Sequence, residues 1–156
     1  MGERVSVRHA DFDVSAEVAA LRAGDAGVGA IVAFVGTVRD HSGAADISRM
    51  ELEHYPGMTE ASIEDIVNQA AQRWPLLAAT VVHRVGKLAA GDQIVWVGVT
   101  SAHRAAAFSA CEFIMDYLKT RAPFWKKELG PDGEQWVAAR QHDSSRAARW
   151  REDNAL

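Results

Sequence analysis

Apolar and polar positions in the first third of the chain predict short strands and one helix. Residues 5–9 alternate as a short strand does, and residues 15–22 fit a short helix that stops near Gly24. Residues 28–38 are a nearly continuous apolar and β-branched run, which is typical of a strand covered on both faces. Residues 47–55 place apolar and acidic side chains alternately, so we expect a half-exposed strand there.

The middle of the chain predicts an amphipathic helix followed by two strands. Pro56-Gly57 ends the preceding strand, and Thr59 is the expected cap of the helix. Residues 80–85 and 93–100 have the composition of strands and are joined through glycine-containing turns. The apolar stripe of the helix, which ends before a proline, consists of Ile63, Ile66, Val67, Ala70 and Trp74.

The last third predicts a long helix and then a hairpin. Ser101 is expected to cap a helix over about residues 102–121, and Pro123 ends that helix. Residues 124–128 and 135–139 are strand-like and flank a Pro-Asp-Gly turn.

The order of these elements predicts the fold class. Strands and helices are mixed without a regular strand-helix-strand repeat, and residues 80–100 and 124–139 fit antiparallel hairpins, so the class is α+β. A length of 156 residues favours one domain over residues 1–156 with a substantial core. From about Ser144 the chain is polar, and we expect a loose helix or a frayed tail.

Composition narrows the class of protein. A content of 48% hydrophobic and 24% charged residues is that of a globular protein and excludes intrinsic disorder and fibrous repeats. A net charge of −4 argues against a general nucleic-acid or membrane-surface binder. No apolar run approaches the roughly 20 residues of a membrane helix, and residues 1–9 lack a secretory pattern, so we expect a cytoplasmic protein.

The cysteine and histidine content makes several kinds of site improbable. The single cysteine, Cys111, excludes an internal disulfide, and its place on the apolar stripe of a predicted helix favours core packing over a nucleophilic role. No two of the six histidines have the i,i+4 spacing of metal ligands on one helix face. We therefore expect neither a metal site nor a bound cofactor.

The basic residues are distributed unevenly. Thirteen are arginines and four are lysines, and three of the lysines fall within nine positions, at Lys119, Lys126 and Lys127. Between Arg104 and Lys127 the charges sum to +3 in a chain whose total is −4. This local reversal of charge indicates where anionic groups could bind.

Two polar clusters are candidates for anion binding. Thr37, Val38 and Arg39 stand where a predicted strand runs into a loop, although a solvated strand end explains them equally well. His103 and Arg104 stand at the start of the long helix, where free backbone N–H groups favour a phosphate or carboxylate. Cations are otherwise unfavourable there, which supports a functional role.

A third cluster combines the lysines with aromatic residues. Lys119, Lys126 and Lys127 lie near Phe124 and Trp125 in the sequence. A desolvated lysine suits acid–base chemistry or an electrostatic clamp, and packing of the lysine stem on an aromatic ring is the alternative.

Helix geometry separates these clusters. Arg104, Phe108, Met115 and Lys119 share one face of the predicted helix, yet Arg104 and Lys119 are roughly 22 Å apart along its axis. Either each chain has two sites, or a dimer places the Arg104 end of one subunit beside the Lys119 end of the other. The second arrangement is our hypothesis.

Four segments resemble a known family. They are LEHYPGMTE at residues 52–60, HRVGKL with a following GD within residues 83–92, VGVTSAHR at 97–104 and FIMDYLKTRAPFWKKE at 113–128. In this order they resemble the large, catalytic subunits of molybdopterin synthases, and the resemblance extends from about Ala30 to Trp150.

The resemblance implies an enzyme of molybdenum cofactor biosynthesis. Such a subunit converts a cyclic pyranopterin monophosphate, precursor Z, into molybdopterin by installing two sulfurs. The sulfur arrives as a thiocarboxylate on the C-terminal glycine of a small ubiquitin-like partner. The implied assembly is a heterotetramer around a dimer of large subunits, and the implied fold is an α/β hammerhead with an additional antiparallel sheet.

The resemblance also implies site residues. Lys119 and Lys126 match the catalytic lysines, and the implied substrate contacts comprise Thr37, Val38, Arg39, His103, Arg104, Lys119, Lys126, Lys127, Glu128 and, on weaker grounds, Arg140 from the opposite subunit.

Two other functions are alternatives to this one. A non-catalytic module that binds a pterin, a nucleotide or a ubiquitin-like protein needs only the charges, whereas a self-contained sulfurtransferase needs Cys111 as a sulfur carrier.

Overall fold

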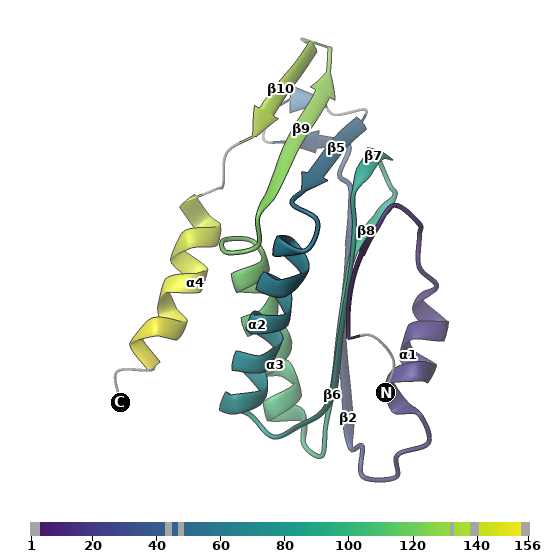
Figure 1. Cartoon of the computed structure of the whole chain (residues 1–156), viewed down its shortest axis with the longest axis vertical. Helices are drawn as coiled ribbons and strands as arrows, with labels where there is room; N and C mark the ends of the chain where they lie inside the picture. The colour runs from purple at the N-terminus through teal and green to yellow at the C-terminus, as the bar shows by residue number, and fades with distance from the viewer. Residues whose placement is uncertain (1–3, 43–44, 47–48, 132, 138–140, 154–156) are drawn as a thin grey trace.

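The computed structural model of the chain describes residues 4–42, 45–46, 49–131, 133–137 and 141–153. Two four-stranded sheets follow one another along the long axis of the molecule, and helices cover the larger sheet (Figure 1). This arrangement of mixed helices and strands confirms the α+β class. None of the helices in the described ranges is long and apolar enough to cross a membrane.

The larger sheet has the strand order β1-β6-β8-β2. β1 (Val5–Arg8) pairs in parallel with β6 (Leu76–Arg84), and β8 (Gln93–Ser101) pairs antiparallel with both β6 and β2 (Ala30–Thr37). The antiparallel pairing predicted within residues 80–100 is thus confirmed.

β2 differs from its prediction. Ala33 and Phe34 point to opposite faces of the sheet and are both exposed, so the expectation of a strand covered on both faces is wrong for a single chain. β2 is also an edge strand. An apolar, β-branched run predicts a strand but does not say how far other elements cover its faces.

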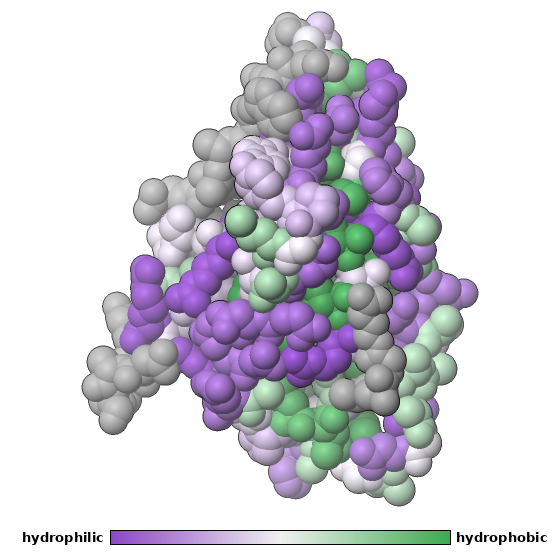
Figure 2. Space-filling view, viewed as in Figure 1, coloured by the Kyte–Doolittle hydropathy of each residue, from purple (hydrophilic) through white to green (hydrophobic). Residues whose placement is uncertain are grey.

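Helices cover both faces of the larger sheet. α2 (Met58–Arg73) and α3 (Arg104–Leu118) lie on one face, and α1 (Val14–Arg22) lies on the other (Figure 1). The face of α2 turned away from the sheet is hydrophilic (Figure 2). The core beneath α2 and α3 includes the fully buried residues Ile63, Val67, Val97, Phe113 and Ile114.

The predicted helix caps are wrong at two positions. α2 begins after Gly57, whose N–H donates to Glu60 at 3.0 Å, while the Thr59 hydroxyl is buried and donates to the carbonyl of Pro123 at 3.0 Å. Ser101 belongs to β8, and its hydroxyl donates to the carbonyl of Pro75 at 2.8 Å, so His103 is the cap of α3. Both hydroxyls make contacts with residues far away in the sequence, which local patterns do not show.

α3 is shorter than predicted. It ends at Leu118 with Lys119 as its C-cap, and the following turn is closed by a hydrogen bond from the Arg121 N–H to the carbonyl of Tyr117, at 2.7 Å. The turn places Phe124 at the start of the second sheet, where β9 begins.

The smaller sheet is antiparallel throughout, with the order β10-β9-β5-β7. β9 (Phe124–Gly130) and β10 (Gly133–Val137) form the predicted hairpin, β5 (Arg49–His54) is the predicted half-exposed strand, and β7 (Gly86–Ala89) was not expected. A small hydrophobic cluster beneath this sheet consists of Val38, Met50, Leu52, Val85 and Leu88. A separate two-stranded pair joins β3 (His41–Ser42) to β4 (Ala45–Asp46).

The C-terminal helix is packed rather than loose. In α4 (Gln141–Asp153), Ala147 and Trp150 are buried. The buried carboxylate of Asp116 on α3 accepts hydrogen bonds from the Trp150 indole at 2.7 Å, from Arg149 at 3.1 Å and from Arg146 at 3.2 Å. The expectation of a frayed tail is therefore wrong for this helix, because its few apolar residues pack against the main core of the same chain, which the sequence does not reveal.

Candidate active site

Three predicted site residues belong to segments that begin or end where the two sheets meet. Lys119 ends α3, Lys126 lies near the start of β9, and Arg39 follows Val38 just after β2. Val38 belongs to the small cluster under the second sheet, and Phe124 packs against the same cluster. The junction between the sheets is therefore the candidate active site.

Lys126 is on the inner face of the smaller sheet. It stands opposite the buried Leu52 on β5, so strand alternation places it on the face that carries the small hydrophobic cluster. Its ammonium lies 3.2 Å from a carboxylate oxygen of Glu128, which is itself buried. The pair leaves Lys126 with one third of its side chain exposed, so it remains accessible to a ligand.

Lys119 approaches the junction from the helical layer. Its charge is close enough to His83 on β6 to lower the pKa of that imidazole. The His83 ring stacks on Phe124 with centroids 4.1 Å apart and planes inclined by 25°. Phe124 and Lys126 are two residues apart on one face of β9, so the stacked pair adjoins the position of Lys126 on that face.

His83 is neutral at physiological pH. Its pKa is lowered to about 4, mainly by loss of hydration and in smaller part by the charges of Lys119 and His54, while the hydrogen bond to the carbonyl of Arg84 opposes these effects. Nδ1 lies 2.9 Å from that carbonyl, which can only accept, so Nδ1 carries the proton. The other ring nitrogen, Nε2, is therefore a hydrogen-bond acceptor.

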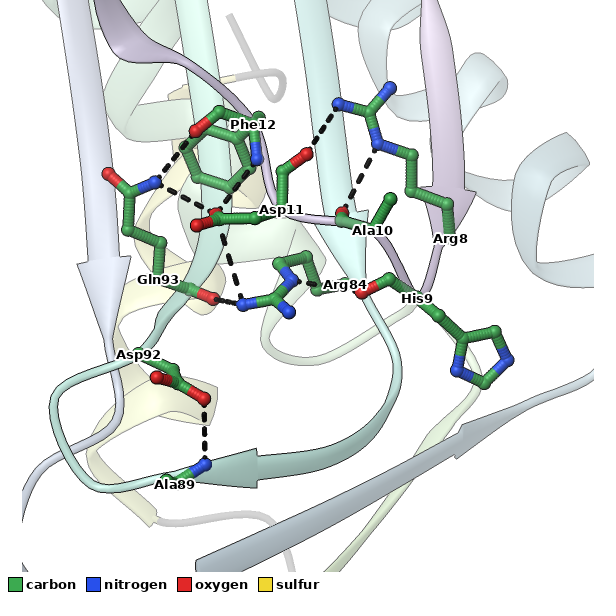
Figure 3. A network of polar contacts seen from close by, with 9 residues as sticks. All are labelled: Arg8, His9, Ala10, Asp11, Phe12, Arg84, Ala89, Asp92 and Gln93. Atoms are coloured by element: carbon green, nitrogen blue, oxygen red, sulfur yellow. Dashed lines mark hydrogen bonds and ion pairs between the residues drawn. The ribbon is translucent and has the colours of Figure 1, made fainter.

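A polar network supports the strand end from which Arg39 emerges (Figure 3). The Arg84 guanidinium donates to the carbonyls of His9 and Gln93 at 3.1 and 2.8 Å, and the Gln93 amide donates to Asp11 at 2.9 Å. The hydrogen bond from Gln93 is the main reason that the pKa of Asp11 is lowered. The neighbouring turn then holds Val38, whose N–H donates to the carbonyl of Asp92 at 2.9 Å.

His103 and Arg104 lie at the other end of the larger sheet. β2 and β8 pair from Ala30 opposite Ser101 to Thr37 opposite Gln93, which separates the two ends by roughly 23 Å. Both side chains are exposed. A single subunit therefore does not bring Arg39 together with His103 and Arg104.

Three further predicted contacts have different positions. Lys127 is on the outer face of β9, opposite Glu51 and beside a hollow of about 70 Å³ that Lys87 also lines. Thr37 is exposed at the end of β2, near Arg39 in sequence. Arg140 lies outside the described residues.

Cys111 has the position expected of a packing residue. Its side chain is buried among core residues, and burial raises the pKa of its thiol to about 12. A thiol with this pKa is poorly suited to nucleophilic chemistry. Within the part of the chain that the structure describes, no three His, Cys, Asp or Glu side chains are grouped as metal ligands.

Comparison with known proteins identifies the family. A family model described as MoaE protein matches residues 7–121. The chain belongs to this family. A MoaE relative from Ralstonia nicotianae, named molybdopterin synthase catalytic subunit, is 58% identical over 146 residues, which cover 94% of this chain and 83% of the relative.

The same fold occurs in solved structures, one of which is a MoaE protein. The MoaE protein of Burkholderia ambifaria MC40-6 superposes with a TM-score of 0.80 at 55% identity, covering 94% of this chain and 96% of that one. A more distant structure from Helicobacter pylori 26695, described as a complex of subunits 1 and 2 of molybdopterin-converting factor, has a TM-score of 0.72 at 18% identity. It covers 88% of this chain and 92% of its own.

Sequence reasoning missed two residues of this MoaE junction, His83 and His54. His54 pairs with Phe124 in the smaller sheet, and its Nε2 lies 3.7 Å from a Glu60 carboxylate oxygen. Both histidines belong to segments that carry the family resemblance, at residues 52–60 and 83–92. Their presence in those segments is the signal that could have indicated them. The spacing of the histidines bears only on metal binding and predicts no role for either residue.

Proposed function

We propose that this chain is the catalytic subunit of a molybdopterin synthase, which converts precursor Z into molybdopterin with sulfur from a small partner. The observation that carries the proposal is the 58% identity over 94% of the chain to a relative named for this activity. The aligned stretch is so long that it necessarily spans the positions of both Lys119 and Lys126.

The junction suits the delivery of sulfur by a protein tail. A C-terminal thiocarboxylate is a small anion on an extended segment, and the two lysine ammonium groups carry the opposite charge. Each transfer forms a bond from the thiocarboxylate sulfur to a carbon of the pterin side chain. The C–O bond at that carbon breaks, and its oxygen leaves with the bonding electron pair, either on the phosphate or, once protonated, as water. Water then releases the acyl group, so the partner's glycine is left with an ordinary carboxylate. Lys119 and Lys126 bind the tail, stabilise the developing charge and protonate the departing oxygen as these steps proceed.

The partner delivers the sulfur, so the catalytic subunit needs no sulfur carrier of its own. The burial of Cys111 and its raised pKa are consistent with this division of tasks. A partner subunit is also supported by the fold likeness to the Helicobacter pylori complex.

We place the complete site between two copies of the chain. Arg39, Lys119 and Lys126 supply one end, and His103, Arg104 and Arg140 of the second subunit supply the phosphate clamp. The separation of the two ends within one subunit supports this arrangement. Edge strand β2 supports it also, because Phe34 and Phe108 are 40% and 62% exposed there and on the adjoining α3, and suit a contact between subunits.

The decisive experiment is conversion of precursor Z by this chain together with a thiocarboxylated partner. Lys126→Ala should lower product formation at least ~100-fold while the thermal midpoint and partner affinity stay near wild type. Lys87→Ala removes an exposed lysine of β7 and serves as the matched control with normal turnover. Full activity of Lys126→Ala would refute the assigned role.

Substitution by arginine separates catalysis from simple charge binding. Lys126→Arg keeps the positive charge but replaces an ammonium that can exchange a proton. The proposed enzyme should bind its partner normally and lose turnover in this variant. Equal partner binding and equal turnover would instead favour a role for charge alone.

A cysteine variant tests the self-contained sulfurtransferase. Cys111→Ser should retain nearly normal turnover, since a buried thiol with a raised pKa takes no part in the reaction. Complete loss of turnover in a folded protein would overturn this prediction.

Mixed subunits test the shared site. Arg104→Ala and Lys119→Ala proteins should each be inactive, and a heterodimer reassembled from the two should regain one intact site of its two. A purified heterodimer without activity would show that both residues serve the same subunit.

A further inference from the structure

The junction contains a histidine that the proposed reaction does not yet use. His83 is on the same face of β6 as Val81 and Val85, which belong to the main core and to the small cluster respectively. It therefore lies where the two cores meet, facing the end of the helical layer. No step of the proposed reaction explains why a polar ring stands at this point.

Three contacts hold the ring in place. Nδ1 donates to the carbonyl of Arg84, one ring face stacks on Phe124, and the pairing of β6 with β1 and β8 holds its backbone. Rotation of the ring would break both the hydrogen bond and the stacking. The position and the tautomer of the imidazole are thus both determined before any ligand binds.

The charges around the ring come from three other elements. Lys119 approaches from the end of α3, His54 from β5, and Glu60 on α2 lies against His54 at 3.7 Å. With Nδ1 occupied, the polar atom that the ring can offer to these neighbours is the Nε2 lone pair. Of the neighbours, Lys119 carries an ammonium group, which can only donate, and a neutral imidazole accepts from it without charge repulsion.

We propose that His83 is a positioning residue for Lys119, whose ammonium it directs toward the partner's C-terminal tail through the acceptor nitrogen of a fixed, neutral imidazole. This inference rests on the proposed function, because it assigns His83 a role through Lys119. Lysine has a long flexible side chain, and a fixed acceptor restricts the positions that its ammonium occupies. His83 itself does not touch the reacting atoms.

Three substitutions separate the functions of the ring. His83→Phe keeps an aromatic ring against Phe124 but removes both nitrogens. His83→Asn places an amide near the position of Nδ1, and His83→Gln places one near the position of Nε2. His9→Gln is the matched control, since His9 is an exposed histidine at the end of β1 on the side of the Arg84 network.

We expect a split between kcat and KM in the conversion of precursor Z with thiocarboxylated partner. His83→Phe and His83→Asn should lower kcat at least ~10-fold with KM for the partner changed less than ~3-fold, and His83→Gln should recover most of the lost kcat. His9→Gln should behave as wild type. Should His83→Phe fail to fold, the comparison of His83→Asn with His83→Gln carries the test.

A double-mutant cycle shows whether His83 acts through Lys119. The measurement is the single-turnover rate of precursor Z conversion with thiocarboxylated partner, which resolves the residual activity of a lysine variant. His83→Phe should lower this rate at least ~10-fold in the wild-type background and have less than a ~2-fold effect in Lys119→Ala. Equal effects in both backgrounds, equal kcat losses in the Gln and Asn variants, or wild-type kcat in His83→Phe would each overturn the inference.

These outcomes are distinct from failure of the proposed function. Full activity of Lys119→Ala and Lys126→Ala would refute the catalytic assignment itself. Inactive lysine variants together with a fully active His83→Phe would leave that assignment intact and refute only the role of His83.

Discussion

The two sheets of this molecule use their strands for different purposes. In β8 of the larger sheet, Val95, Trp96, Val97 and Val99 are at most 3% exposed and are covered by helices on both faces. In β9 of the smaller sheet, charged side chains occupy both faces, with Lys126 and Glu128 inside and Lys127 outside. The larger sheet can therefore supply most of the stability, while the smaller one positions charges.

This division has a physical basis. A strand covered on both faces gains stability from apolar burial, and charges there would lose hydration without compensation. A sheet with one open face can hold charged groups that are only partly desolvated. The candidate site lies at the edge between these two environments, where a lysine can be both anchored and accessible.

The largest expected effect is the loss of core packing under α3. Phe113→Ala should lower the free energy of unfolding by about 4 kcal/mol, because the ring is fully buried and packs edge-on against Trp74, Tyr117 and Trp150. Denaturant unfolding monitored by circular dichroism measures this change.

The matched control for that substitution is an exposed apolar residue of the sheet that α3 covers. Leu77 on β6 is 44% exposed, and Leu77→Ala should cost less than about 1 kcal/mol. Similar losses for both variants would show that burial beneath α3 is not the source of this stability.

The next effect concerns the boundary between the sheets and depends on pH. In the folded protein the pKa of His83 is about 4, below its ordinary value of 6.5, so the unfolded chain binds more protons between these values. Stability should therefore fall as the pH is lowered from about 6.5 to about 4, by an amount on the order of 3 kcal/mol at most.

His83→Phe isolates this contribution. The difference in unfolding free energy between wild type and variant should change across that pH range and be constant above pH 7. Asp11 does not interfere, since its lowered pKa affects stability below about 3.8, its ordinary value. A constant difference at all pH values would show that His83 does not stay neutral.

Among the buried positions, the smallest expected effect on stability is in the smaller sheet. Leu52→Ala should cost about 2 kcal/mol, because Leu52 belongs to a cluster of five buried residues and the site can partly collapse. When both are expressed as free energies, the loss of turnover should exceed the loss of stability, since Leu52 stands opposite Lys126. Unfolding and precursor Z conversion measured on the same preparation test this; a loss as large as that of Phe113→Ala would contradict the comparison.

Much of the fold was predictable because local patterns carry it. The alternation of residues 47–55 predicted β5 and its buried residues Met50 and Leu52, and the apolar stripe of α2 and the packing position of Cys111 were also confirmed. The helix caps at Thr59 and Ser101 were wrong because both hydroxyls bond to carbonyls 64 and 26 residues away. Local propensity cannot anticipate such contacts.

The candidate site was predictable in its residues more than in its geometry. The concentration of lysine at positions 119–127 and the family resemblance both indicated Lys119 and Lys126, which the structure directs toward one junction. The same reasoning grouped Arg39 with His103 and Arg104, although the antiparallel pairing of β2 and β8 puts them at opposite ends of a sheet. It also passed over His83, whose properties arise entirely from its surroundings.

The sequence by itself determined most of the secondary-structure elements, the α+β class and the lysines of the candidate site, because periodicity, turn residues and composition act over a few positions. Only the tertiary structure decided which strand became an edge, which face of β9 each lysine occupies and which imidazole loses its charge. These properties depend on pairing, burial and electrostatic interactions between segments far apart in the chain, and no local pattern contains them.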